Sequence, residues 1–541
     1  MFISPFFSSS EPQTRYALWL ALLAALLFFP ALGARDFWAP AEPRYAEIAR
    51  VMFAKGEWIV PTVNGDLYTD KPILYFWLVL IASNIAGAVS EWTVRLPVAL
   101  GGLGVVLTTY VIGKDFFSPR VGFIAGAVLA TSARVIWEGR WAHVDMPFTF
   151  FFALSMYFTA RTILNKGNPY EMLAAYALLA LATLTKGLIG VVLPALILLS
   201  FVAIRRDWRL LLRARLPLGI GVFLLIAAPW FIWVNSATDG KWLEDFIYLH
   251  HIQRYTAGLG HRQPFYYYFK TLPVDFLPWT VFALPALFAY KLERKSIVNP
   301  ASFLLVLWFA VVFLFFSFSD TKRDLYLLPL FPPLALLVGV YIDDLVTGKL
   351  PLSKIPRSML LLFFAALSIG CLALPVAAWL LRKDAFWVSL PVALTMACCG
   401  LAAFYFIWRR IAWLAFISTV FSMLLGVLTA SVWLLPFIDQ FKSPRSFALK
   451  VKSKIPATAQ LFIYADTMND YNFYMERTVI SVVRSLAELQ KLLVQEQPAY
   501  MLIKQKDLDG SQLITGDRII LQEGTGERAW CLIALGHRTS Q

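Results

Sequence analysis

Hydrophobic runs separated by short polar segments fill most of the chain as far as residue 437. Thirteen of them reach or approach the length of about 20 helical residues that crosses a bilayer. The expected spans are Ala17–Gly33, Leu96–Ile112, Val121–Ala133, Pro147–Ala160, Tyr170–Leu184, Leu188–Ile204, Leu216–Asn235, Val274–Tyr290, Ala301–Ser317, Leu325–Leu345, Ser358–Leu381, Trp387–Trp408 and Ala412–Pro436. The pattern therefore predicts a polytopic α-helical membrane protein.

The apolar segment Pro72–Ser90 decides the topology. If it crosses the membrane, every later loop changes side. If it lies along the interface, the loops assigned to the cytoplasm hold more Lys and Arg than the outside loops, as cytoplasmic loops usually do. We therefore predict an interfacial segment, a cytoplasmic N-terminus and a C-terminus outside. Just before it, hydrophobic residues from Tyr45 to Phe53 recur at helical spacing, which predicts an amphipathic helix at the membrane surface.

The pattern changes after about residue 440, where apolar runs shorten and strand and helix patterns alternate. We expect helices at Phe447–Ile455 and Leu486–Leu493, and strands at Leu461–Tyr464, Val479–Val483, Tyr500–Lys504, Ile519–Leu521 and Trp530–Ala534. This predicts a transmembrane domain over residues 1–437 and a soluble α/β domain over residues 438–541. The α/β domain has no Gly-rich phosphate loop and no catalytic motif, so we expect it to be a stabilising or docking module.

Composition supports a membrane protein, since 59% of residues are hydrophobic and only 15% are charged. The net charge of +14 is assigned to cytoplasmic loops and anionic headgroups, and no nucleic-acid partner is expected. The four cysteines have no spacing typical of a metal site or a disulfide framework. The first run, Ala17–Gly33, is interpreted as a retained anchor rather than a cleaved signal peptide.

Ionisable residues gather in the loops predicted to face outward, at residues 34–95, 134–146, 236–273 and 318–325. A single charge at a membrane boundary more often snorkels to water, but several loops converging on one side favour a functional site. Carboxylates can act as a base or bind a cation, and Lys and Arg neutralise phosphate. Together they favour group transfer from a phosphate-bearing lipid donor at the outer leaflet. Aromatic residues among them, such as Trp38, suit a sugar face or a headgroup.

Several of these segments resemble the bacterial lipid A aminoarabinose transferases, which belong to the protein O-mannosyltransferase-like, GT-C class. The matching residues run from Phe37 to Arg50, from Gly56 to Pro61 and from Tyr68 to Pro72, followed in the same order by Thr185-Lys186-Gly187, His251–Arg254 and Phe316 to Pro329. The resemblance implies a GT-C fold with thirteen transmembrane helices, periplasmic amphipathic helices and a C-terminal α/β domain.

The resemblance also implies an inverting membrane glycosyltransferase of the bacterial inner membrane, with its active site and C-terminal domain in the periplasm. Its donor would be a sugar on undecaprenyl phosphate, and its acceptor a lipid or glycan such as lipid A. By this resemblance Lys71 and Arg254 hold the donor phosphate, Lys322 and Tyr326 line the same cavity, and Asp145 is the second-loop acid. Asp70 and His251 would bind a divalent metal ion. Arg44, Tyr45, Tyr68 and Lys186 complete the predicted substrate-binding set.

The chain departs from the family pattern at four positions. Ala41 stands where an aspartate, the proposed base, is usual; Asp70 replaces a glutamate, His250 a glutamate and Asp324 a proline. Three explanations for Ala41 remain open. Glu42 or Asp36 substitutes as the base, the acceptor is an ionised phosphate that needs no strong base, or the protein is a weak relative. Our hypothesis takes Glu42 as the working carboxylate.

Two other functions also remain open. A transporter or flippase of a lipid-linked sugar would want cationic phosphate sites too, although transporters usually place charge near the midplane and in repeated halves. The charges here lie at the outer rim, and no internal repeat is visible. A non-catalytic lipid-binding relative is the third interpretation, favoured by Ala41.

Overall fold

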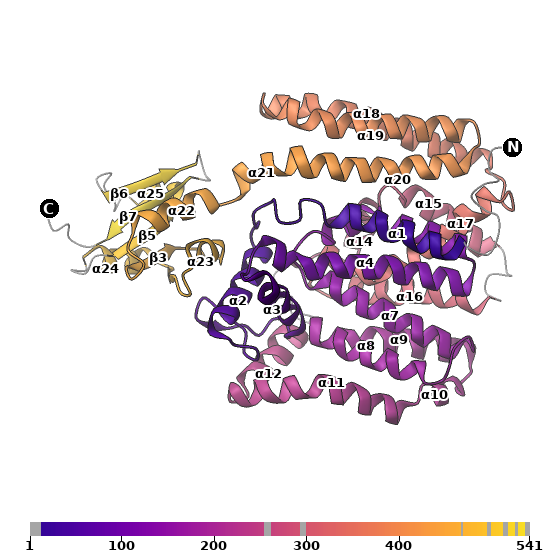
Figure 1. The fold of residues 1–541 in the computed structure, drawn as a ribbon, viewed down its shortest axis with the longest axis horizontal. Coiled ribbons are helices and arrows are strands. Elements are labelled where there is room, and N and C mark those ends of the chain that lie inside the picture. Colours follow the sequence, from indigo (N-terminus) through magenta and orange to yellow (C-terminus); the bar gives the residue numbers. More distant parts are fainter. Residues whose placement is uncertain are drawn as a thin grey trace.

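The computed structural model of the protein shows a long helical bundle with a small sheet at one end (Figure 1). The structure describes residues 12–253, 261–292, 299–466, 469–494, 499–511, 518–524 and 529–535. The bundle is built from α1 (Pro12–Phe28), α4 (Glu91–Phe116), α5 (Pro119–Ala130), α7 (Asp145–Ile163), α8 (Glu171–Lys186), α9 (Ile189–Arg205), α11 (Leu216–Ala237), α15 (Thr280–Leu292), α16 (Pro300–Phe318), α17 (Phe331–Val346), α18 (Lys354–Leu381), α19 (Ala385–Trp408) and α20 (Ala412–Thr429).

Shorter elements connect these helices. They are α2 (Ala41–Lys55), α3 (Leu74–Ala86), α6 (Ala133–Glu138), α10 (Leu210–Arg213), α12 (Lys241–Ile247), the π-helix η2 (Tyr248–Gln253), α14 (Tyr267–Asp275), the 3-10 helix η3 (Asp324–Leu330), the π-helix η4 (Ala430–Leu434) and α21 (Leu435–Lys442). Each hydrophobic run predicted to span the membrane corresponds to one of the bundle helices, with boundaries shifted by a few residues.

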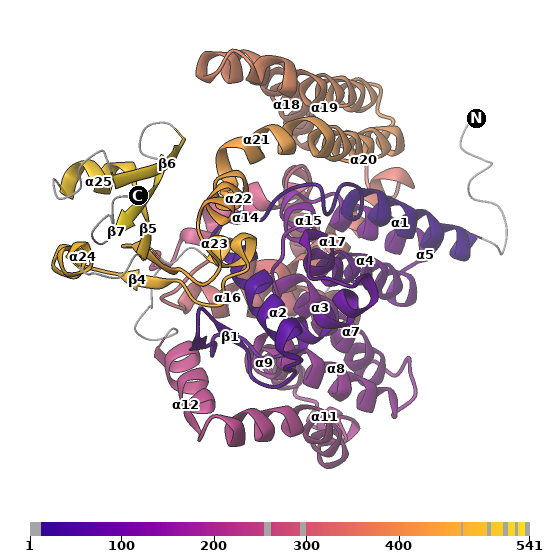
Figure 2. The same ribbon diagram turned by 60° about the vertical axis from the view of Figure 1, so that its left-hand side comes forward.

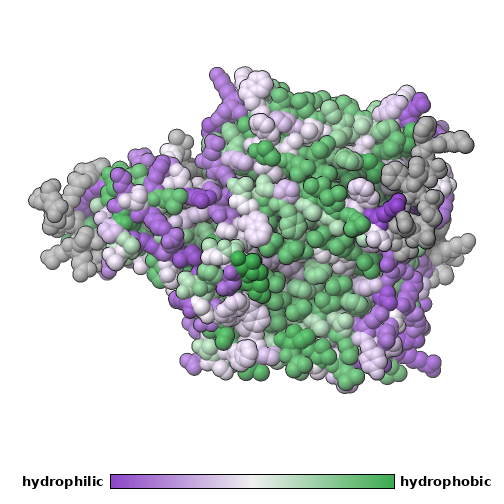
Figure 3. Space-filling model, viewed as in Figure 1, coloured by the Kyte–Doolittle hydropathy of each residue, from purple (hydrophilic) through white to green (hydrophobic). Residues whose placement is uncertain are grey.

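The bundle has the surface of a multi-pass membrane protein. A broad hydrophobic band crosses it, with hydrophilic residues at both ends (Figure 3). Among the described residues, seven helices are long and apolar enough to cross a bilayer, and four shorter apolar helices accompany them. Large apolar side chains such as Leu225 and Leu381 are more than three quarters exposed. In water this would be costly, whereas lipid is a favourable partner for such a surface.

The segment Pro72–Ser90 forms α3 rather than a full span. Its 13 helical residues cover about 20 Å, which is short of the roughly 30 Å of a bilayer core. Figures 1 and 2 show α2 and α3 together at the end of the bundle that carries the C-terminal sheet, while the N-terminus lies at the other end. The short hairpin of β1 (Thr62–Val63) and β2 (Asp66–Leu67) connects them.

Small residues let the helices of the bundle approach closely. A methyl group on Gly122 of α5 would lie 2.4 Å from the carbonyl oxygen of Tyr110 and 2.8 Å from the amide nitrogen of Lys114, both in α4. Gly101 of α4 similarly meets Pro147 of α7, at 2.9 Å from its nitrogen. Small residues at crossings are typical of membrane helices, because packing must replace the hydrophobic effect there.

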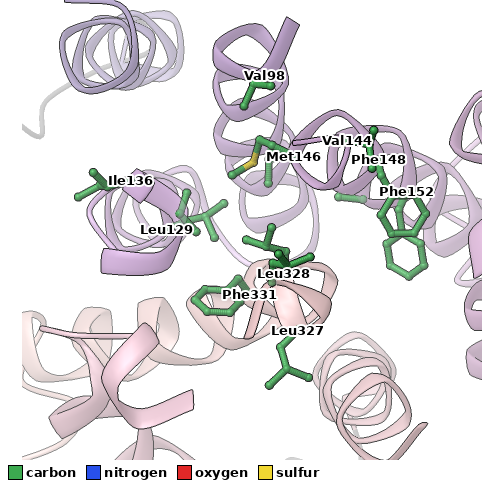
Figure 4. Packing of buried hydrophobic residues seen from close by; sticks show 14 of the residues in the cluster. Val98, Leu129, Ile136, Val144, Met146, Phe148, Phe152, Leu327, Leu328 and Phe331 are labelled. Atoms are coloured by element: carbon green, nitrogen blue, oxygen red, sulfur yellow. The ribbon is translucent and has the colours of Figure 1, made fainter. Parts of the chain in front are cut away.

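The core of the bundle continues beneath the end that carries the C-terminal sheet. Figure 4 shows side chains of four segments in contact there, with Val98 from α4, Leu129 from α5, Phe148 from α7 and Leu328 from η3. All four are at most 1% exposed. Because interiors are packed as densely as organic crystals, this cluster fixes the start of α7 and the η3 turn relative to each other.

The chain after α21 forms a mixed sheet with helices. Its elements are α22 (Arg445–Lys454), β3 (Gln460–Tyr464), α23 (Asn469–Met475), β4 (Ser481–Val483), α24 (Leu486–Leu493), β5 (Ala499–Lys504), α25 (Gln505–Ser511), β6 (Ile519–Glu523) and β7 (Trp530–Leu535). The strand order is β4-β3-β5-β7-β6, parallel from β4 to β5 and antiparallel from β5 to β6. Each predicted strand overlaps one of these five.

The crossing of α4 and α5 yields a first prediction. Gly122→Ala should cost about 1–3 kcal/mol, because the added methyl group meets backbone atoms that cannot rotate away. The matched control is Gly221→Ala in α11, where nothing lies within 4 Å of the added carbon. Thermal unfolding in detergent compares the two variants. Equal stability of both would contradict the close approach of these helices.

Candidate active site

A polar cavity of about 300 Å³ opens at the end of the bundle that carries the C-terminal sheet. Its walls come from the loop before α2, from α6 and the loop after it, and from the segments around α14 and η3. The lining residues are Pro40, Ala41, Arg134, Trp137, Glu138, Trp141, His143, His261, Gln263, Tyr267, Lys322, Arg323, Asp324 and Leu325. Most of them are polar, so this cavity differs in kind from the apolar core around it.

Arg134 connects three carboxylates at this cavity. Its guanidinium lies 2.7 Å from Asp275, 3.0 Å from Asp324 and 3.3 Å from Glu138. Asp324 accepts a further hydrogen bond from the Tyr267 hydroxyl. Three acids around one arginine leave the network with a net negative charge. The network is also rigid, because the planar guanidinium fixes the direction of each bond.

The loop from Gly139 to Val144 presents His143 to the cavity. The ring Nδ1 of His143 lies 2.9 Å from Glu138 Oε2. Two anchors hold the loop. Arg140 donates to the carbonyl oxygens of Leu27 and Pro30, both at 2.8 Å. His143 is only 7% exposed, and its Nε2 has no hydrogen-bond partner among the described residues.

Glu42 is a structural centre, and this argues against its predicted role as the working base. Its carboxylate receives paired hydrogen bonds of 2.8–3.0 Å from Arg35 and Arg95. The backbone amides of Trp38 and Ala142 also donate to it, at 3.2 and 3.0 Å. With no exposed surface and every lone pair engaged, it has no free oxygen for an acceptor. The neighbouring residue Ala41, by contrast, lines the cavity.

Electrostatics agree with a structural Glu42. Burial alone would raise its pKa, but the charges and hydrogen bonds of Arg95 and Arg35 outweigh burial and lower the pKa to about 2. A carboxylate that holds its negative charge so strongly is a poor base.

Asp36 also lies away from the cavity, contrary to its predicted catalytic role. Its carboxylate accepts from Arg445 at 2.9 Å, and its amide donates to Asp439 at 3.1 Å. The nearby Tyr474 hydroxyl accepts from the Phe37 amide at 2.9 Å. Asp36 therefore belongs to the contact between the first loop and the chain that leads into the C-terminal sheet.

Lys71 is paired with Asp70, and the pair lies beside His250. Lys71 Nζ lies 2.9 Å from Asp70 Oδ1, and His250 Nδ1 lies 3.3 Å from the same oxygen. The other ring nitrogen of His250 contacts Thr69 Oγ1 at 3.1 Å. The replacement of a family glutamate by His250 therefore places a cation or a neutral donor next to Asp70.

The predicted aromatic residues adjoin this pair. Tyr45 and Tyr68 interact with each other, and both feel the charges of Arg44 and Asp70. Burial is the largest influence on both phenols, and it raises the pKa of each. The Tyr45 ring also lies 6.3 Å from the His143 ring. The Asp70–Lys71 group and the cavity wall therefore belong to one continuous region.

A second ion pair joins Asp145 and Lys186, the first residue of α7 and the last of α8. The Lys186 ammonium also lies 5.0 Å from the ring centre of Tyr326, within the range of a cation–π contact. The structure thus brings together three predicted site residues that are distant in sequence.

Lys322 reaches the cavity wall, where its ammonium donates to the carbonyl oxygens of Ser319 and of Gln263, the latter at 3.0 Å. Burial lowers the pKa of Lys322, against the opposing influence of Asp320. Two other predicted residues lie outside this description: Arg254 is not among the described residues, and neither is the side chain of His251.

The residues that could hold a metal do not form a site within the described part of the chain. No group of three or more His, Cys, Asp or Glu side chains is arranged there to bind an ion. Asp70 instead engages Lys71 and His250. We therefore derive no chemical step through a metal ion.

The sequence analysis missed the Arg134 network and the His143–Glu138 pair as components of the site. Arg134 is not among the predicted site residues, although it lies in the predicted outer loop 134–146. The signal was present in the spacing Arg134-x-x-x-Glu138, which places both side chains on one helical face. The contribution of Tyr267 and Asp275 required the tertiary structure, since both come from a distant helix.

The buried Glu42 yields a second prediction. Glu42→Gln should destabilise the fold by about 3–5 kcal/mol, because it leaves the guanidinium groups of Arg35 and Arg95 without their charge partner. Unfolding in detergent measures this, with Asp384→Asn as the control, since that pair with Arg382 is exposed. A stable Glu42→Gln variant that binds donor but transfers no sugar would restore Glu42 as the base.

The same residue gives an acid dependence. Because its pKa is lowered from 4.5 to about 2 in the fold, the stabilisation by Glu42 is present above pH 4.5 and is lost as pH falls towards 2. The wild type should therefore lose stability as the pH falls over this range, and Glu42→Gln should not show this loss. Unfolding measured at several pH values compares the two proteins.

Comparisons with known proteins agree with this architecture. Residues 70–233 match the family described as dolichyl-phosphate-mannose-protein mannosyltransferase. The chain is 33% identical over 369 residues to an undecaprenyl phosphate-alpha-4-amino-4-deoxy-L-arabinose arabinosyl transferase of Pectobacterium atrosepticum, covering 66% of this chain and 64% of that relative. The match therefore spans less than two thirds of the relative. An uncharacterized protein of Aquifex aeolicus is 28% identical over 488 residues, 90% of each chain.

Solved structures show the same fold. ArnT from Cupriavidus metallidurans bound to undecaprenyl phosphate superimposes with a TM-score of 0.80 at 23% identity, covering 96% of this chain and 98% of that one. The archaeal oligosaccharyltransferase AglB from Archaeoglobus fulgidus gives a TM-score of 0.54 at 11% identity, over 91% of this chain and 69% of that one. The sequence therefore resembles relatives named as arabinosyl transferases and matches part of the mannosyltransferase family model, and the fold is that of the solved ArnT structure.

Proposed function

We propose that the protein is an inverting membrane glycosyltransferase that moves a sugar from undecaprenyl phosphate to an acceptor outside the membrane. The observation that carries this proposal is the polar cavity at one end of an apolar bundle, with cations and acids from several loops around it. A lipid carrier can keep its chain in the hydrocarbon while its phosphate and sugar enter such a cavity. The resemblance to relatives named as arabinosyl transferases supports the same chemistry.

The leaving group sets the role of the cations. When the bond between sugar and phosphate breaks, negative charge grows on the lipid phosphate, and preorganised cations nearby lower the barrier. Lys71 and Lys186 are suited to this role, because each is already held by a carboxylate, that of Asp70 and that of Asp145 respectively. Arg44, Tyr45 and Tyr68 supply a charge and two phenols to the same region, which suits a sugar and its phosphate.

The proposed topology has thirteen spans, with a cytoplasmic N-terminus and a periplasmic C-terminal α/β domain in the bacterial inner membrane. The N-terminal end of α1 and the C-terminal sheet lie at opposite ends of the bundle, which an odd number of spans requires (Figure 1). Helices such as α5, with 12 residues, are short for a bilayer and need burial by neighbours. The C-terminal domain, residues 438–541, would hold the outer loops in place through contacts such as Arg445–Asp36.

The acceptor is proposed as a lipid or glycan at the outer leaflet, with lipid A as the first candidate, since relatives transfer aminoarabinose by name. A transporter remains the alternative from another class. Cavity position disfavours it, because the charged groups lie at one end of the bundle and not near its middle.

Purified protein in detergent, supplied with an undecaprenyl phosphate-linked sugar and lipid A, tests the proposal. A transferase should release undecaprenyl phosphate and add a sugar mass to the acceptor without any second compartment, whereas a transporter would do neither. Mass spectrometry of lipid A from cells with and without the gene identifies the acceptor. Unchanged lipid A together with active donor turnover would move the acceptor to another glycan or a protein.

Lys71 gives a third prediction. Lys71→Met should weaken binding of undecaprenyl phosphate by about tenfold to a hundredfold, the equivalent of one charge-assisted hydrogen bond of about 1.5–3 kcal/mol. Displacement of a fluorescent polyprenyl phosphate measures the affinity. The control is Lys166→Met, an exposed lysine between α7 and α8 at the other end of the bundle, which should bind as the wild type does. Equal losses in both variants would mean that Lys71 acts only through general charge.

A further inference from the structure

We propose that His143, oriented by Glu138, is the general base that takes the proton of a hydroxyl acceptor in the cavity beside Ala41. The proposal rests on the transferase function above and narrows it, since it assigns the acceptor to the hydroxyl class rather than the phosphate class. An acceptor phosphate is already ionised at neutral pH and would need no such group.

The geometry of His143 is that of an oriented imidazole. Glu138 Oε2 lies 2.9 Å from Nδ1 and is an acceptor, so the neutral ring carries its proton on Nδ1 and leaves a lone pair on Nε2. Glu138 is itself held by Arg134 at 3.3 Å, and only 1% of its surface is exposed. A base whose other nitrogen is fixed by a buried carboxylate is the arrangement that lets a histidine accept a proton and stabilises the resulting charge.

The Nε2 atom is buried without a hydrogen-bond partner among the described residues, in a residue that lines the cavity. Leaving a buried polar atom unsatisfied costs about 1–3 kcal/mol, so such atoms in a fold need an explanation. A hydroxyl group bound in the cavity would satisfy this one. The anchored Gly139–Val144 loop holds His143 in place without any bound hydroxyl group. The contacts of this loop therefore offset the cost of leaving Nε2 without a partner.

The carboxylates near the cavity have other engagements. Of the residues lining it, the acids are Glu138 and Asp324, and Asp324 accepts from both Tyr267 and Arg134. Asp145 pairs with Lys186, and Glu42 is enclosed by two guanidinium groups. Ala41 contributes only a methyl group to the wall. His143 is therefore a buried lining residue with an uncommitted lone pair for a proton, whereas the other lining histidine, His261, is exposed.

The proposed step balances as follows. The acceptor O–H bond breaks and its proton moves to Nε2 of His143. The acceptor oxygen forms a bond to the anomeric carbon of the sugar, while the bond from that carbon to the phosphate oxygen breaks and its electron pair leaves with the lipid phosphate. Products are the glycosylated acceptor, undecaprenyl phosphate and an imidazolium paired with Glu138, which later returns its proton to solvent.

The charged and titratable groups around the ring come from three segments. Glu138 and Arg134 belong to α6, Tyr45 of α2 lies with its ring 6.3 Å away, and the aromatic Trp141 of the same loop lies at 6.3 Å. The Glu138 carboxylate is the nearest of these charges, with its Oε2 2.9 Å from Nδ1.

His143→Ala tests the base directly, using full-length protein in detergent with an undecaprenyl phosphate-linked sugar and an acceptor that turns over. We expect kcat to fall by about 10²–10⁴-fold, the usual contribution of general base catalysis, with undecaprenyl phosphate affinity unchanged. Added imidazole should restore part of kcat, because the cavity of about 300 Å³ has room for it. A variant that is folded, binds undecaprenyl phosphate and keeps wild-type kcat would overturn the proposal.

Glu138 is a positioning residue, and its test needs a readout beyond stability. Glu138→Gln should lower kcat with KM for the donor unchanged, and imidazole should not rescue it while His143 is present. Its control is Glu171→Gln, which removes a carboxylate 2.7 Å from Arg161 at the opposite end of the bundle and should leave kcat unchanged. Equal effects on kcat in the two variants would mean that Glu138 acts only through the fold.

Ala41 allows a gain-of-function test that distinguishes a catalytic from a purely structural role of His143. Because Ala41 lines the same cavity, Ala41→Asp would place a carboxylate there, and the double variant Ala41→Asp/His143→Ala should transfer sugar faster than His143→Ala alone. If a folded double variant recovers no transfer activity and imidazole does not rescue His143→Ala, His143 is not the general base. If the wild type turns over no donor at all, the transferase function itself fails, which the undecaprenyl phosphate release assay detects separately.

Discussion

The fold of the bundle end that carries the C-terminal sheet depends on one buried carboxylate with two guanidinium partners. Glu42 joins Arg35 in the first loop, Arg95 in α4 and the Ala142 amide in the second loop. Removing a carboxylate from water is costly by several kcal/mol and is tolerated only when cations and hydrogen bonds compensate it. Since each partner comes from a different segment, none of the three can move without breaking the others.

The rigidity of this end explains how a small cavity can hold several charged groups in place. The Arg35 guanidinium lies 4.5 Å from Trp38 and 4.4 Å from Trp141, so aromatic faces cover the ion pair on the side of the cavity. The second loop, fixed by Glu42 and Arg140, then brings His143 against Glu138. Polar groups fixed in advance need no reorganisation during reaction, which is the main benefit of a rigid site in catalysis.

The C-terminal sheet takes part in the same arrangement. Asp439 in α21 accepts from the Trp38 indole and the Asp36 amide, and Tyr474 in α23 contacts both Phe37 and Glu91. These contacts reach the first loop just before Glu42. The C-terminal segments therefore contact the first loop directly, as a stabilising module would.

The sequence by itself determined the helical bundle, the short helix α3 and the strands of the C-terminal sheet, because hydrophobic periodicity is a local signal along the chain. It also predicted Lys71, Lys186 and Tyr326 as parts of one site, and in the structure the Lys186 ammonium lies 5.0 Å from the ring centre of Tyr326. Only the tertiary structure decided what surrounds Glu42 and Asp36, because partners such as Ala142 and Arg445 lie 100 and 409 positions away. Burial and pairing fix the chemistry of an acid or an imidazole, and neither is written in the neighbouring residues.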